Sequence, residues 1–136
     1  MILKESVYVS DYTLDKESAL EGAEHEFNGV NVSEVIEKSL VMVAIPRGTL
    51  ADVESAIKKS CGLSIPKMEQ STKSSDSSIT LWRLQNSQVL AYFSYDGDDS
   101  ESHLKSKFNA PVYFTDQSDT WAMIRVEGPK SRDILE

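Results

Sequence analysis

The chain has 136 residues, of which 40% are hydrophobic and 26% charged, values typical of one globular domain. Its net charge of -8 disfavours binding to nucleic-acid phosphates or anionic membranes. A single cysteine excludes an internal disulfide, and no apolar run approaches the roughly 18 residues that a membrane-spanning helix needs. We therefore expect a cytoplasmic protein without nucleic-acid or membrane partners.

Residues 1–39 are predicted to form an acidic extended arm that holds at most short elements. The apolar residues there are sparse and aperiodic, and Gly22, Asn28, Gly29 and Asn31 interrupt them. Nine acidic and three basic residues fall within residues 1–38. The arm either lies on a partner surface or is a solvated tail.

The first predicted strand is the continuous apolar run Leu40–Ile45, typical of a strand covered on both faces. Thr49 is placed to cap a helix over residues 50–59, with apolar positions at helical spacing, an early acid and late lysines. Gly62 is expected to end this helix as a C-terminal cap.

The next segment, Ser71–Ser78, is polar and of low complexity, which predicts a mobile loop. Residues 79–84 and 89–93 flank the turn-forming Gln85–Gln88, so they are predicted to be an antiparallel hairpin.

The last part of the chain carries a short helix at Ser102–Phe108, preceded by acids that favour a helix start. Residues 112–115 and 120–126 are expected to pair as strands around Asp116–Asp119. Gly128 and Pro129 then end the strand and begin a last helix.

This order of elements predicts an α+β fold, with a largely antiparallel sheet and helices on one face. Residues 40–136 would form the single domain, and a split βαβ module would have the same order.

Chemistry-bearing residues form no recognisable motif. Asp96–Glu101 is rich in carboxylates, but the twelve-residue calcium loop would need a glutamate where Lys107 stands, so helix-start acids are the favoured interpretation over calcium. His25 and His103 lie among acids, and no GxSxG, GxGxxG or GxxxxGK[ST] pattern occurs. Cys61 at a helix end is expected to be an inert thiol. We therefore assign no catalytic, cofactor-binding or metal-binding residue to this chain.

The predicted strands are rich in aromatic residues, which serve either as core or as interface anchors. They are Trp82, Tyr92, Phe93, Tyr113, Phe114 and Trp121.

Three stretches together resemble the gamma subunit of heterotetrameric sarcosine oxidase. They are Val30–Glu34 leading into the strand before Pro46-Arg47-Gly48, then Cys61–Pro66, and the strand, Gly-Pro and helix of Ser118–Leu135. The last stretch is also similar to the related folate-binding domain of the glycine cleavage T-protein. Gln85–Leu90 departs from the Gly-Pro-Asp-Glu-Trp-like segment usual in the family. The family also continues past the last helix, so this chain resembles a half module, from a truncated or a divergent member that a partner would complete.

The resemblance implies a non-catalytic accessory subunit of a complex that oxidatively demethylates sarcosine or a related N-methyl amine, in one-carbon metabolism. Partners would be alpha-, beta- and delta-like subunits. FAD, FMN, NAD, zinc and tetrahydrofolate would be carried by those partners, and none by this chain.

Two other functions are considered. An independent folate-type binding module would need convergent polar groups in an apolar cleft, for which Arg83, Arg125 and Asp119 are the strand-borne candidates. A free-standing hydrolase or transferase is less favoured because the sequence offers no motif for one.

Overall fold

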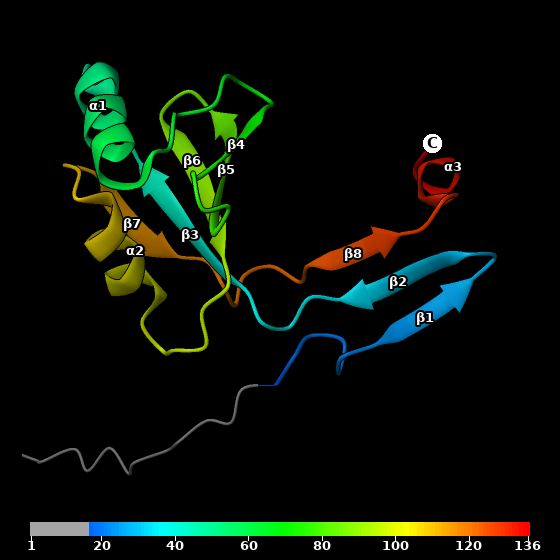
Figure 1. The fold of residues 1–136 in the computed structure, drawn as a ribbon. Coiled ribbons are helices and arrows are strands. Elements are labelled where there is room, and N and C mark those ends of the chain that lie inside the picture. Colours follow the sequence, from blue (N-terminus) through cyan, green and yellow to red (C-terminus); the bar gives the residue numbers. More distant parts are fainter. Residues whose placement is uncertain (1–16) are drawn as a thin grey trace, which may run out of the picture.

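The computed structural model describes residues 17–136 and has an α+β fold, which confirms the predicted class (Figure 1). Its strands are β1 (Glu24–Phe27), β2 (Val30–Glu34), β3 (Ser39–Ala44), β4 (Ser71–Lys73), β5 (Ile79–Gln85), β6 (Gln88–Phe93), β7 (Tyr113–Asp116) and β8 (Ile124–Glu127). Its helices are α1 (Leu50–Cys61), α2 (Ser100–Phe108) and α3 (Ser131–Leu135). In this part of the chain, no helix is long and apolar enough to cross a membrane.

The larger sheet contains five strands in the order β4-β5-β6-β3-β7, all antiparallel to their neighbours. Helices α1 and α2 lie together on one face of this sheet, as predicted (Figure 1). The core fills the space between them, because alternate strand residues point toward the apolar sides of the helices. Its buried members include Val41, Val43, Val53, Ile57, Leu81, Ala91, Phe93, Leu104 and Phe108.

The two covering helices have defined ends. Gly62 adopts a left-handed conformation with φ of 68° and donates its N–H to the Lys58 carbonyl, which confirms the predicted C-terminal cap of α1. Asp99 caps α2, since its carboxylate accepts the N–H of Ser102 at 2.9 Å.

A smaller sheet of three strands, in the order β1-β2-β8, extends away from the larger one (Figure 1). Strands β1 and β2 form a hairpin across Asn28 and Gly29, whose φ values of 50° and 78° match a tight turn of the primed type. Residues 24–34, expected to belong to an arm, therefore include two paired strands. Residues 1–16 of that arm lie outside the described residues, and the boundary at residue 39 stays a prediction.

The expected pairing of the last two strands is wrong. Strand β7 pairs with β3 in the larger sheet, whereas β8 begins at Ile124 and pairs with β2 in the smaller one. The chain between them follows the start of β3, where Gln117 donates its N–H to the Leu40 carbonyl at 2.7 Å and Ser118 Oγ accepts the Leu40 N–H. Lys38 also donates to the carbonyls of Ser118 and Trp121. These contacts carry the chain from one sheet to the other.

The predicted mobile loop at Ser71–Ser78 is also wrong. Ser71–Lys73 forms β4 at the edge of the larger sheet, and the turn after it is ordered by hydrogen bonds. Ser74 is buried there, and its Oγ accepts the N–H of Ile79 at 3.0 Å. Low sequence complexity did not prevent order, because serine side chains can satisfy backbone groups locally.

Candidate subunit interface

Among residues 17–136, no helix and no second sheet covers the face of the larger sheet that is opposite α1 and α2, and we call it the open face (Figure 1). Strand registers place the following residues there: Leu40, Met42, Ala44, Ser71, Lys73, Thr80, Trp82, Gln85, Gln88, Leu90, Tyr92, Tyr113 and Thr115. Leu40, Thr80 and Leu90 are buried by their neighbours on this face, and the others are partly or fully exposed. Lys73 is the sole charged residue among them, although charged residues make up 26% of the chain. Depletion of charge with enrichment of aromatic residues and methionine is typical of the centre of a protein interface.

Aromatic side chains dominate the centre and one edge of the open face. Trp82 and Tyr92 stack with ring centroids 5.5 Å apart and planes inclined by 24°. Tyr113, on the edge strand β7, is 72% exposed, which is unusual for so large a side chain. Large, partly desolvated aromatic residues supply much of the binding energy in many interfaces.

The predicted aromatic residues therefore divide into two groups. Phe93 is buried in the core and Phe114 packs against it, so both lie on the helix side of the sheet. Trp82, Tyr92 and Tyr113 lie on the open face. Trp121 precedes β8 instead of belonging to it, and it is half exposed.

The smaller sheet has one apolar and one polar face. Pairing places five apolar residues, Phe27, Val30, Val32, Ile124 and Val126, on the same side as His25 and Glu34. Val30 is fully buried there, whereas Phe27 and Ile124 are largely exposed. The other side is polar, and Asn31 Nδ2 donates to Glu24 Oε1 at 2.8 Å there. This alternation is typical of an antiparallel sheet with one face intended for burial.

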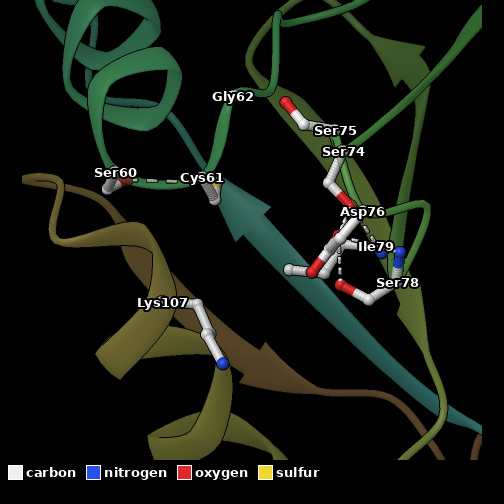
Figure 2. Close-up of a pocket in the computed structure, with 9 residues that line it drawn as sticks. All are labelled: Ser60, Cys61, Gly62, Ser74, Ser75, Asp76, Ser78, Ile79 and Lys107. Atoms are coloured by element: carbon white, nitrogen blue, oxygen red, sulfur yellow. Dashed lines mark hydrogen bonds between the residues drawn. The ribbon is translucent and has the colours of Figure 1, made fainter.

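A cavity of about 290 Å³ lies between the end of α1, the turn after β4 and α2 (Figure 2). It is lined by Ser60, Cys61, Gly62, Ser74, Ser75, Asp76, Ser78, Ile79 and Lys107. Cys61 Sγ lies 3.2 Å from the Ile57 carbonyl, in its own helix. None of these lining residues is a histidine that could activate the thiol.

Asp76 organises the wall of this cavity. Its Oδ1 accepts hydrogen bonds from Ser74 Oγ at 2.6 Å, Ser78 Oγ at 2.7 Å and the Ser78 N–H at 3.0 Å. The Ser74 and Ser78 hydroxyls, followed by the Ser78 amide, stabilise the ionised carboxylate and hold the pKa of Asp76 well below its ordinary value. Because these hydroxyl groups already bind Asp76, this part of the wall has a structural role.

The two histidines lie on different parts of the fold. His25 is on β1 of the smaller sheet. His103 is on α2, and its ring stacks on Tyr95 with centroids 4.3 Å apart. The structure therefore does not bring either of them to Cys61 in the lining of the cavity.

Asp96–Glu101 supplies the helix cap described above. Ser102 holds the pKa of Asp99 below its ordinary value, through its hydroxyl first and then its backbone N–H. Within residues 17–136, no three histidine, cysteine, aspartate or glutamate side chains are grouped so that they could hold a metal ion.

The three charges nominated for a small-molecule site are not brought together. Arg83 on β5 donates to the carbonyls of Pro66 and Asn86 at 3.2 and 2.8 Å. Arg125 is on β8 of the other sheet and lies 3.9 Å from Glu127. Asp119 is in the turn before β8, so its expected place on a strand is wrong.

No protein-family model matches this sequence, and no curated protein matches it. Among solved structures, the fold is similar to a chain of the heterotetrameric sarcosine oxidase from Corynebacterium sp. U-96, determined in complex with pyrrole 2-carboxylate. The TM-score is 0.56 at 17% sequence identity, and the match covers 77% of this chain and 53% of that chain. This chain therefore spans about half the length of the chain it matches, and the similarity is one of fold.

Proposed function

We propose that this chain is a non-catalytic accessory subunit of a sarcosine oxidase type complex, and that the open face of its larger sheet docks on a partner subunit. The uncovered, charge-depleted aromatic surface around Trp82 and Tyr92 carries this proposal. A sheet face of this composition is stabilised when another apolar surface excludes water from it.

The physical argument rests on what the open face would gain from burial. Met42, Trp82 and Tyr92 are already half buried and Tyr113 is exposed, so docking would remove further apolar area from water at roughly 25 cal/mol per Å². A stable interface buries roughly 800 Å² on each partner, so the docked surface would include the open face together with residues around its edges. The stacked rings lose little rotamer freedom on binding, because they already restrain each other.

Two similarities support the choice of complex. The sequence stretches ending in Ser118–Leu135 resemble the gamma subunit of this family, and the fold is similar to a chain of a heterotetrameric sarcosine oxidase. On this proposal, alpha-, beta- and delta-like subunits would carry FAD, FMN, NAD, zinc and tetrahydrofolate. The complex would demethylate sarcosine or a related N-methyl amine by oxidation, and this chain would brace the largest subunit in the cytoplasm.

The test is affinity purification of the full tagged chain from its native cells, with mass spectrometry and a visible spectrum of the eluate. We expect large flavin-bearing subunits to co-purify. A Tyr113→Glu substitution should remove them, since docking would desolvate a carboxylate at this edge of the open face. The matched control is Lys59→Glu, an exposed charge reversal on α1, and it should retain them.

Two outcomes would contradict the proposal. In the first, the wild-type chain elutes as a colourless species without flavoprotein subunits. In the second, the subunits remain bound to both variants. A chain that instead binds tetrahydrofolate by itself in calorimetry would favour an independent folate-type binding module.

A further inference from the structure

Strand β8 lies at the edge of the smaller sheet, and its outer side has no neighbouring strand among the described residues. The Val35 N–H donates to the Met123 carbonyl at 2.9 Å, so odd-numbered residues of this strand point their backbone groups toward β2. The N–H and C=O groups of Ile124 and Val126 therefore point outward. Such an edge is a template for pairing with another strand.

The charges on β8 are self-complementary about Val126. In an antiparallel pair of two β8 strands with Val126 opposite Val126, Arg125 of each copy lies opposite Glu127 of the other. Positions 125 and 127 would then be non-hydrogen-bonded neighbours, the pairs whose side chains approach most closely. Ile124 would lie opposite Gly128, which has no side chain to obstruct it.

Strand β1, at the other edge of the same sheet, has charges that oppose self-pairing. Glu34 donates its N–H to the Ala23 carbonyl, so the outward groups of β1 belong to Glu24 and Glu26. Self-pairing of β1 about His25 or about Glu26 would place glutamates opposite glutamates, which is destabilising. One edge is thus protected from self-association by like charges, and the other is not.

We infer that the protein forms a homodimer through β8, with two copies paired antiparallel about a twofold axis at Val126. Backbone hydrogen bonds between Val126 of one copy and Val126 of the other join the two three-stranded sheets into one continuous sheet. Both apolar faces then lie on the same side, so Ile124 and Val126 of the two copies form a single stripe. Figure 1 shows α3 past the C-terminal end of β8 and displaced to the side away from β2, so the paired strands can overlap only over β8 itself. This surface is separate from the open face, so the dimer does not depend on the proposed function.

The dimer is tested by sedimentation velocity of the full chain between about 1 μM and 1 mM, a range that covers weak self-association. We expect the wild type to move from monomer to dimer as its concentration rises. Arg125→Glu and Glu127→Arg should each remain monomeric, because each places like charges opposite one another. Mixing these two variants should restore a dimer, since every cross-strand pair is then of opposite charge.

Two further variants separate pairing from folding. Val126→Pro removes an N–H that points away from β2, so it should abolish the dimer while circular dichroism of the monomer is unchanged. Lys59→Glu, on α1, should dimerise like the wild type. A wild type that stays monomeric throughout, or two charge variants that fail to form a mixed dimer, would overturn the inference.

Discussion

Single side chains decide whether the polar turn after β4 is ordered. Asp76 gathers two serine hydroxyls and one amide, and the Ser74 hydroxyl in turn accepts an amide from the start of β5. The turn is therefore joined to the sheet through one carboxylate. The composition of the turn does not reveal this role of Asp76, because its serines are chemically identical and only Ser74 and Ser78 bind the carboxylate.

Replacing Asp76 with alanine should lower the stability of the protein at neutral pH and have less effect in acid. Its pKa is lowered in the folded state, so its contribution is present above the ordinary value of about 3.9 and declines as the pH falls below it. Urea midpoints of wild type and Asp76→Ala at several pH values check this, with Asp119→Ala as an exposed acidic control. A difference between the midpoints that is equal at every pH would contradict the assigned role.

At the scale of elements, the end of α1 shows how one glycine joins a helix to a neighbouring turn. The left-handed cap at Gly62 requires a backbone that other residues rarely adopt. A methyl group there would also overlap Ser75 Oγ. The helix end and the serine turn are therefore packed against each other at this point.

A Gly62→Ala substitution should destabilise the protein by about 1–2 kcal/mol from the left-handed backbone, with an additional loss from the overlap with Ser75. Gly48→Ala is the matched control, since Gly48 has a φ of 80° and no atom near the added methyl. Gly62→Ala should therefore lower the thermal midpoint more than Gly48→Ala, and Ser75→Ala should recover part of the difference. Equal midpoints for both glycine variants would indicate that backbone strain alone matters.

At the scale of the whole molecule, the two sheets differ in how much of their apolar surface is buried. The larger sheet has a core under two helices, whereas exposed residues make up all of β1 and most of β8. Val30 is the one fully buried residue among strands β1, β2 and β8, so the smaller sheet removes little apolar area from water. Binding of a partner or of a second copy should therefore stabilise the smaller sheet more than the larger one.

Hydrogen exchange should resolve this difference. In dilute protein, amides of β1, β2 and β8 should exchange much faster than those of β3, β5 and β6, because the smaller sheet opens without unfolding the core. Mass spectrometry of labelled peptides measures both sets in one experiment. Raising the concentration should slow exchange in β8 first, if β8 pairs with a second copy. Uniform exchange across both sheets would contradict the unequal stability.

Local pattern alone predicted much of the larger sheet and of the helix α1 that covers it. The apolar run at Leu40–Ile45, the helix that ends at Gly62 and the hairpin of β5 and β6 were all predicted, because their periodicity and caps are contained within short stretches. The aromatic strand residues of the candidate interface were also recognised. Neighbours such as Tyr92 and Phe93 had to point to opposite faces, but periodicity could not indicate which of them lies in the core.

Only the tertiary structure decided whether Tyr92 or Phe93 lies in the core, and which strands pair with β7 and β8. The register of β6 against β3 and β5 places Phe93 under the helices and Tyr92 on the open face. Strands β7 and β8 are close in sequence, yet contacts of Ser118 with Leu40 lead them into different sheets. Such pairings depend on residues nearly eighty positions apart, which no local pattern contains. Local pattern thus determined the central elements but missed β1, β2 and β4, and long-range packing determined which surfaces remain free to bind.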